Sequence, residues 1–256
     1  MLEGKKGLIF GIANDHSIGW GIAKKLYENG AQIALTYQNE NLLKRVKPLA
    51  EQIASKNLIQ CDFAESGSID NCFKKLSQSW ENIDFVVHAA AYADKQELNG
   101  KYINTSKENF KNTLNISCYS FTHIAKKASE IMKNGGSLIT LSFYGANKVM
   151  PNYNIMGVAK AALETSVKYL SVDLGDKNIR VNAISAGPVR TLSGAAISGA
   201  REVFNYAKEN SPLKRSVGLE EIGNASLFLI SDFSEAITGE IHYVDCGYNI
   251  IGMPKK

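Results

Sequence analysis

Short apolar runs alternate with longer segments of helical periodicity along the chain, and this alternation constrains the fold more than any other feature. The runs are rich in Ile, Leu and Val and almost continuously apolar, which is typical of parallel strands covered by helices on both faces. We predict strands at Lys6–Ala13, Ala31–Tyr37, Asn57–Asp62, Ile83–Ala90, Gly136–Ser142, Ile179–Ser185 and Glu240–Val244. The pattern therefore predicts an α/β fold with a doubly wound, seven-stranded parallel sheet.

Helical periodicity fills the intervals between these strands. The predicted helices cover Ile18–Asn29, Glu40–Ser55, Ser68–Trp80, Lys107–Lys133, Asn152–Asp176 and Leu219–Ser231. No Pro/Gly/Ser-rich linker and no shift in composition divides the chain, so we expect residues 1–256 to form a single domain. Only Gly187–Ser211 lacks a clear assignment in the second half, and a loop of that length usually has a functional role.

Composition and charge argue against several other classes of protein. Hydrophobic residues make up 45% and charged residues 21%, which is typical of a globular chain. The net charge of +4 is spread along the sequence and gives little support for nucleic-acid binding. No apolar run is long enough for a membrane helix or placed as a signal peptide requires, so we expect a cytoplasmic protein. The four cysteines and four histidines show no ligand spacing, and we expect no metal site.

The first predicted strand leads into a glycine-containing turn and then a helix, the order that forms the pyrophosphate site of Rossmann-type domains. Gly11 permits the tight turn, and Gly19 would let the helix backbone approach the phosphates. Ser17 is expected to cap the helix while its hydroxyl and the neighbouring amides face the anion. The alternative is a purely structural turn.

Gln38 stands at the end of the second strand, where a carboxylate normally holds the adenosine ribose of NAD. Its amide can bind the ribose hydroxyls without charge, and no Arg or Lys beside it could receive a 2′-phosphate, so NAD is favoured over NADP. Asp62 follows the third strand, where it could bind the adenine amino group or cap the following turn.

Tyr153 and Lys160 follow the fifth predicted strand and are seven residues apart. Seven steps of about 100° return to within about 20° of the same direction, so both side chains are expected on one face of a helix. Lysine there can hold the nicotinamide ribose, and its charge would favour a polarised tyrosine hydroxyl beside a developing oxyanion. An amphipathic surface pair is the alternative for the two residues alone.

Together these segments resemble a short-chain dehydrogenase/reductase and, within that superfamily, a bacterial-type enoyl-acyl-carrier-protein reductase. The resemblance rests on the Gly11-x5-Ser17-Ile18-Gly19 turn, on Gln38, on Tyr153-x6-Lys160 and on the segment Arg180–Leu192. It implies an NADH-dependent reductase of fatty-acid synthesis that receives its substrate on acyl-carrier protein, and homotetramers are common in the family.

The resemblance also implies roles for individual residues. Tyr153 would hydrogen-bond the thioester carbonyl oxygen as enolate charge develops, and Lys160 would bind the nicotinamide ribose. The expected cofactor-binding residues are Gly11, Ser17, Ile18, Gln38, Asp62, Phe63, Ala90, Lys160, Ile184 and Thr191. The expected substrate-binding residues are Ala93, Phe143, Tyr144, Tyr153 and Ile197.

The chain departs from the family where many relatives place a second tyrosine, ten residues before the reacting one. Phe143 stands there and cannot donate a hydrogen bond, so that role is either dispensable or supplied by Tyr144. The wider spacing of Tyr153 and Lys160 suggests a hypothesis: in an enoyl thioester the hydride-accepting carbon lies two carbons from the oxygen, and the tyrosine must reach a different place.

The segment Thr191–Ser211 is the expected substrate-binding part of the chain. Its small and apolar residues suit a mobile lid with hinges at Gly194 and Gly199, although an ordinary helix pair joined by a glycine fits equally well. Two other functions remain as alternatives: a carbonyl reductase or alcohol dehydrogenase of the same superfamily, and a nucleotide-binding sensor without turnover.

Overall fold

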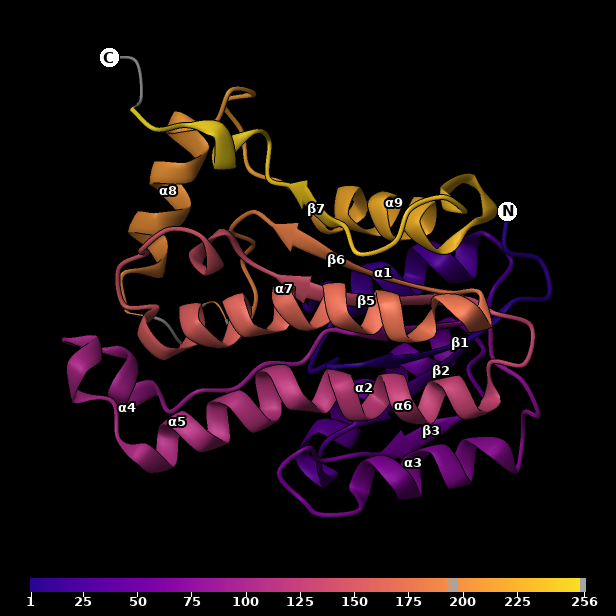
Figure 1. The fold of residues 1–256 in the computed structure, drawn as a ribbon. Coiled ribbons are helices and arrows are strands. Elements are labelled where there is room, and N and C mark those ends of the chain that lie inside the picture. Colours follow the sequence, from indigo (N-terminus) through magenta and orange to yellow (C-terminus); the bar gives the residue numbers. More distant parts are fainter. Residues whose placement is uncertain (193, 195–197, 254–256) are drawn as a thin grey trace.

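Seven parallel strands form the centre of the computed structural model, which describes residues 1–192, 194 and 198–253 (Figure 1). The strands are β1 (Lys6–Phe10), β2 (Gln32–Tyr37), β3 (Leu58–Gln60), β4 (Phe85–His88), β5 (Gly136–Ser142), β6 (Ile179–Ala186) and β7 (Ile241–Val244). Their order in the sheet is β3-β2-β1-β4-β5-β6-β7. Every predicted strand is confirmed, and every neighbouring pair is parallel.

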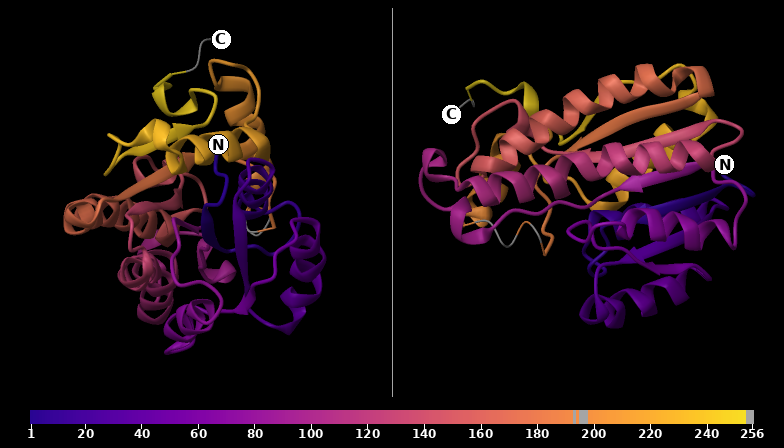
Figure 2. Two further views of the ribbon diagram at one scale, coloured as in Figure 1. Left: turned by 90° about the vertical axis from the view of Figure 1, so that its right-hand side faces the viewer. Right: turned by 60° about the horizontal axis from the view of Figure 1, so that its bottom comes forward.

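Helices cover both faces of the sheet, as Figure 2 shows. On one face lie α1 (Ile18–Glu28), α2 (Glu40–Gln52) and α9 (Leu219–Ile230). The other face carries α3 (Ser68–Ser77), α6 (Ser120–Ile131) and α7 (Asn154–Leu174). The remaining α-helices of the described chain are α4 (Lys95–Leu98), α5 (Lys107–Leu114) and α8 (Ala200–Asn210). The fold is therefore the predicted doubly wound α/β sheet.

Alternating strand residues divide the core between the two faces. Ile9 of β1 packs with the α1, α2 and α9 side, whereas its neighbours Leu8 and Phe10 pack with the α3, α6 and α7 side. Each of the three is at most 1% exposed. Because successive strand side chains point to opposite faces, a strand buried on both sides must be apolar throughout, which explains the continuous apolar runs of the sequence.

One predicted helix differs from the structure, and α8 was not predicted. The segment predicted as one helix from Lys107 to Lys133 is divided by a π-helical turn at Asn115–Tyr119, between α5 and α6. Half of the unassigned region forms α8, which begins after Gly199 in a left-handed conformation with φ 75°. A glycine is suited to that conformation because it has no Cβ to clash with the backbone.

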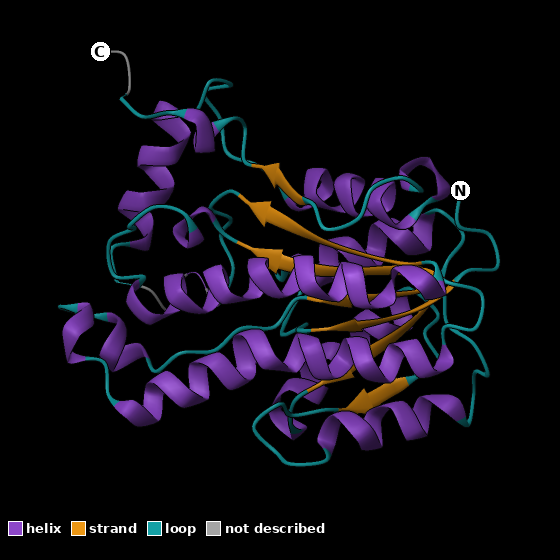
Figure 3. Cartoon of the chain, viewed as in Figure 1, coloured by secondary structure: helices purple, strands orange, loops and turns teal. Residues whose placement is uncertain are grey.

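The carboxyl ends of the strands meet at the edge of the sheet from which α4 and α8 extend (Figure 3). Strand order reverses at β1, which pairs with β2 on one side and β4 on the other. In open α/β sheets, ligands bind outside the carboxyl ends at such a switch point. This edge is therefore where the candidate site lies.

Candidate active site

The turn after β1 has the geometry of a pyrophosphate site. Gly11 has a φ of +89°, and a Cβ there would overlap the backbone of Ala89 and Ala90. The first two amides of α1, at Ile18 and Gly19, make no hydrogen bond with the described part of the chain. Free amides at a helix N-terminus bind an anion, so the turn fits the diphosphate of a dinucleotide.

One expectation about this turn was wrong, namely that the Ser17 hydroxyl caps the helix. Ser17 occupies the N-cap position, but its hydroxyl makes no capping bond to the helix. Instead Ser17 Oγ accepts hydrogen bonds from Ala13 N at 3.0 Å and Asn14 N at 3.1 Å, and so it closes the turn. A Cβ at Gly19 would meet Ile12 Cγ1 at 3.2 Å and Ala89 Cβ at 3.3 Å. The small size of Gly19 therefore serves the packing of α1.

Gln38 and Asp62, predicted separately, form a direct contact at the ends of β2 and β3. Gln38 Nε2 donates to Asp62 Oδ2 at 3.0 Å, and the amide oxygen of Gln38 accepts no hydrogen bond from the described residues. Asp62 Oδ1 also accepts from Ala64 N at 2.9 Å, as the turn-capping alternative requires. Phe63 stacks on the ring of buried His88, with centroids 5.6 Å apart. These residues present an amide, a carboxylate and an aromatic wall at one end of the site.

Tyr153 lies just outside the helix in which it was predicted. Helix α7 begins at Asn154, and Tyr153 is its N-cap residue. Asn152 and Asn154 have positive φ values of 56° and 38°, so regular helix does not reach back to Tyr153. The helical count from Tyr153 to Lys160 therefore starts one residue outside α7, and both side chains are buried.

Lys160 is anchored to the end of β5. Its Nζ donates to Leu141 O at 2.7 Å. An ammonium carries three donor hydrogens, so two remain for ribose hydroxyls. Burial lowers the pKa of Lys160 to about 8, against the raising effects of Cys118 and Glu164. Near neutral pH the side chain is therefore still mainly a cation.

The electrostatics of Tyr153 differ from the expectation. Burial, followed by the negative charge of Glu164, raises the pKa of Tyr153. This direction is opposite to the polarising effect expected from Lys160. Tyr153 therefore remains a protonated phenol, which can donate a hydrogen bond to an oxyanion.

An apolar cluster surrounds Tyr153 and includes two of the expected substrate-binding residues. Phe143 packs edge-on against Tyr153, with ring centroids 4.9 Å apart. Ala93 packs against the same cluster, which also contains Leu98 and Met156. Sequence analysis missed these last two, although Met156 follows Tyr153 by three residues and could have been found by helical spacing. The cluster gives the site an apolar wall.

Tyr144 and Phe143 pack against different neighbours. Its ring packs against Tyr248 at 5.7 Å, and Tyr248 in turn packs against Tyr206 of α8 at 6.3 Å. It is Phe143 that contacts Tyr153. Whether the hydroxyl absent at Phe143 is dispensable or supplied by Tyr144 stays a question for experiment. Ile197, also expected at the substrate, lies outside the described residues.

The last three expected cofactor residues have different environments. Ala90 is half-buried and follows β4, beside the Gly11 turn. Thr191 Oγ1 accepts from Gly194 N at 2.9 Å and starts the segment toward α8. Ile184, by contrast, is fully buried in the core, so its side chain is not part of the surface of the site. The sequence of β6 could not show which of its apolar side chains lie in the core and which reach the site.

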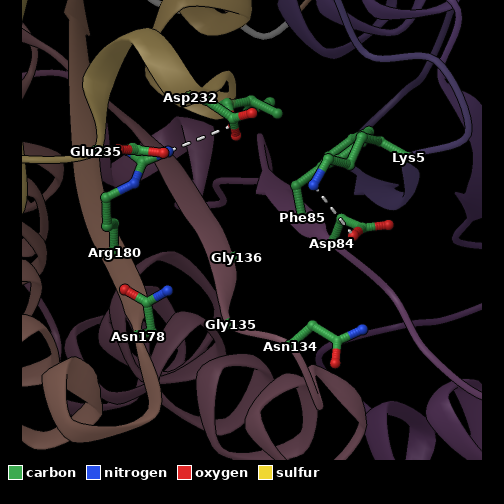
Figure 4. Close-up of a pocket in the computed structure, with 11 residues that line it drawn as sticks. Lys5, Asp84, Phe85, Asn134, Gly135, Gly136, Asn178, Arg180, Asp232 and Glu235 are labelled. Atoms are coloured by element: carbon green, nitrogen blue, oxygen red, sulfur yellow. Dashed lines mark hydrogen bonds and ion pairs between the residues drawn. The ribbon is translucent and has the colours of Figure 1, made fainter.

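A cavity of about 410 Å³ lies at the opposite, amino-terminal edge of the strands (Figure 4). Its lining includes Lys5, which pairs with Asp84 at 3.7 Å, and Arg180, whose guanidinium donates to Leu229 O at 2.8 Å. This edge of the sheet is remote from the switch point, where ligands of such folds bind.

The described residues contain no group of three or more His, Cys, Asp or Glu side chains that could hold a metal ion. In the same part of the chain, no helix is long and apolar enough to cross a membrane.

The doubly wound sheet, the glycine turn and the buried Tyr153 and Lys160 together define a dinucleotide-dependent oxidoreductase of the short-chain dehydrogenase/reductase type. The sequence model of the family described as "Enoyl-(Acyl carrier protein) reductase" matches residues 11–249. The chain belongs to this family.

Individual relatives are similar over nearly their whole length. "Enoyl-[acyl-carrier-protein] reductase [NADH] 2" of Rhizobium meliloti is 55% identical over 254 residues, which cover 99% of this chain and 95% of the relative. The crystal structure of FabI from Candidatus Liberibacter asiaticus is 56% identical with a TM-score of 0.97, covering 99% and 98% of the two chains. The reductase of Anaplasma phagocytophilum, solved in complex with NAD, is 55% identical with a TM-score of 0.96, covering 100% and 97%.

Proposed function

We propose that this protein is an NADH-dependent enoyl-[acyl-carrier-protein] reductase, which reduces the trans-2 double bond of enoyl thioesters in the last step of the fatty-acid elongation cycle. The observation that carries the proposal is the position of Tyr153 and Lys160. Both are buried beside the carboxyl end of β5, at the same sheet edge as the glycine turn after β1. A chain of this family with that arrangement has the parts that the reaction needs.

The residues of the chain fit NADH. The open amides of Ile18 and Gly19 suit the diphosphate, and the amide oxygen of Gln38 suits the adenosine ribose. Lys160 has two donor hydrogens left for the second ribose. When bound, the reduced nicotinamide would supply a hydride for the β-carbon of the enoyl thioester.

The chemistry asked of the chain is stabilisation of the enolate. Adding hydride to the β-carbon places negative charge on the thioester oxygen, and the protonated Tyr153 hydroxyl donates to that oxygen. The raised pKa of Tyr153 keeps its proton in place during this step. The α-carbon then takes a proton that comes finally from solvent. The apolar wall of Phe143, Leu98 and Met156 keeps the reacting carbons away from bulk water.

The partner and the setting follow from this function. The substrate would arrive on acyl-carrier protein, with Thr191–Ser211 as the substrate-binding segment. We also propose a homotetramer, because such assemblies are common in the family, and a cytoplasmic location.

A spectrophotometric assay tests the function. Purified protein is given crotonyl-CoA and NADH, and the loss of NADH absorbance is followed in parallel with NADPH and with a β-ketoacyl thioester. NADH consumed only with the enoyl substrate is the expected result. A preference for the β-ketoacyl substrate would instead identify a carbonyl reductase, and NADH binding without turnover on any enoyl thioester, including one carried on acyl-carrier protein, would identify a sensor.

A further inference from the structure

A buried carboxylate lies one helical turn beyond Lys160 in α7. Glu164 is 8% exposed, and both of its oxygens accept hydrogen bonds from neutral groups. Ser142 Oγ donates to Oε1 at 2.6 Å, and Asn147 Nδ2 donates to Oε2 at 3.2 Å. Two donors to the two oxygens are what an ionised carboxylate needs in a buried position. Burying a charge is costly, so a buried carboxylate at Glu164 needs an explanation.

Glu164 and Lys160 hold successive residues of β5. Lys160 Nζ donates to Leu141 O, and Glu164 accepts from the next residue, Ser142. The residue after that is Phe143, which packs edge-on against Tyr153. Two side chains of one helix therefore fix the strand end that places the wall of the reaction site.

The same carboxylate bears on the charge of Lys160. The titratable groups that face Lys160 and Glu164 come from four elements: His88 of β4, Cys118 of the π-helical turn, Tyr243 of β7, and Tyr153 at the start of α7. Burial raises the pKa of Cys118, Tyr153 and Tyr243, so these groups are neutral near pH 7.

His88 is neutral as well. Burial, and then the charge of Lys160, lowers the pKa of His88 to about 3. Among the groups just named, Glu164 is thus the one that can carry negative charge beside Lys160. Residues four apart on a helix are neighbours, and a carboxylate at that spacing favours the ammonium form of the lysine.

We propose that Glu164 is a positioning residue of this active site, which fixes the end of β5 through Ser142 and supplies the counter-charge that keeps Lys160 a cation. It does not touch substrate or cofactor and acts through its two neighbours. The inference rests on the proposed function for the reaction that Lys160 serves, but the binding of NADH tests it without turnover.

The experiment separates charge from hydrogen bonding. Glu164→Gln keeps the size and an acceptor for Ser142 but removes the charge, and Glu164→Ala is a second variant without the charge. Ser142→Ala is the matched control, because it removes the hydrogen bond and leaves the charge. NADH affinity is measured by fluorescence titration from about pH 6 to about pH 10, with kcat/KM for NADH over the same range.

In the wild type we expect NADH affinity to fall as Lys160 loses its proton, with a midpoint near its pKa of about 8. Both Glu164 variants should move this midpoint to lower pH by about one unit. Ser142→Ala should keep the wild-type midpoint and lower kcat severalfold at every pH, since the end of β5 is loosened. Near pH 6, where Lys160 is charged in every variant, the affinity of Glu164→Gln should approach that of the wild type.

If the midpoint is unchanged in Glu164→Gln, the charge of Glu164 does not act on Lys160. If Glu164→Gln and Ser142→Ala shift the midpoint equally, the effect comes from packing and not from the charge. Unchanged kcat in Ser142→Ala would overturn the positioning of β5. Failure of the proposed function is seen separately, as wild-type protein that binds NADH with the expected midpoint but does not reduce crotonyl-CoA.

Discussion

Gly145 lies directly against the ring of Tyr153: a Cβ at Gly145 would stand 2.5 Å from Tyr153 Cδ1 and 2.7 Å from Cε1. Gly157 extends the contact, because a Cβ there would approach Gly145 O at 2.8 Å. The turn after β5 and the start of α7 therefore meet through two glycines. A side chain at Gly145 would occupy the space that the Tyr153 ring fills.

Gly145→Ala should accordingly displace the ring of Tyr153. We expect kcat with crotonyl-CoA to fall by about 10- to 100-fold, because small misplacements of a reacting group are costly. NADH affinity should stay within about threefold, since the turn carries none of the expected cofactor-binding residues. Gly175→Ala is the control, because a Cβ there meets nothing within 4 Å. Equal losses in the two variants would contradict the relationship.

Substitutions of Tyr153 and Lys160 should have different effects, one mainly on turnover and the other mainly on cofactor binding. Tyr153→Phe removes the donor to the enolate oxygen and keeps the ring, so kcat should fall by about 100- to 1,000-fold with little change in NADH affinity. Lys160→Ala should mainly weaken NADH binding. Steady-state kinetics and fluorescence titration of NADH measure the two quantities. Equal effects on both quantities in both variants would count against the assignment.

The strands were predictable from the sequence because their signal is local. A strand such as β1 is buried on both faces and must be apolar throughout, whatever surrounds it. Helix α4 has only four residues and is too short to show a period. The start of α7 was misplaced because the left-handed residues Asn152 and Asn154 leave no trace in a hydrophobic pattern.

A site residue was predictable where its position relative to a strand or helix end indicates its role, and not where its role depends on a contact with another element. Gln38 could be found because it ends a strand, but its bond to Asp62 joins two strand ends that only the sheet brings together. Glu164 was missed for the same reason: its partners Ser142 and Asn147 belong to another element. Ser17 was expected to accept from the amides of the helix that follows it, but in the folded turn its hydroxyl accepts from Ala13 N and Asn14 N, which precede it.

Choice of coenzyme should depend on the Gln38–Asp62 contact. The Asp62 carboxylate lies 3.0 Å from the Gln38 amide nitrogen, so a 2′-phosphate at this end of the site would meet a negative charge. Gln38→Arg should raise the NADPH/NADH ratio of kcat/KM by about tenfold or more, since a charge pair near a protein surface contributes one to a few kcal/mol. Asp62→Asn should raise it less.

The control for this prediction is Lys44→Gln, which changes an exposed charge within α2. Its NADPH/NADH ratio should equal that of the wild type. If Lys44→Gln lowers the ratio as much as Gln38→Arg raises it, the general charge of the surface decides coenzyme choice, and the contact does not.

Acid stability should report on His88. Its ring is fully buried, with Nδ1 2.8 Å from Thr140 Oγ1 and Nε2 2.9 Å from Ser120 Oγ. Burial, and then the charge of Lys160, lowers its pKa from 6.5 to about 3. Between these values the unfolded chain binds a proton that the folded chain does not, so stability is lost as the pH falls from about 6.5 toward 3.

At about pH 4.5 this loss amounts to about 2 to 3 kcal/mol relative to pH 7, from 1.36 kcal/mol for each pKa unit. His88→Gln lowers stability at neutral pH through its altered hydrogen bonds, but it should show a correspondingly smaller loss between the two pH values. Urea unfolding of both proteins at each pH measures the difference. His16→Gln should keep the wild-type loss, because the His16 side chain is 71% exposed. If His88→Gln loses as much stability in acid as the wild type, then His88 is not the group that the folded state keeps unprotonated.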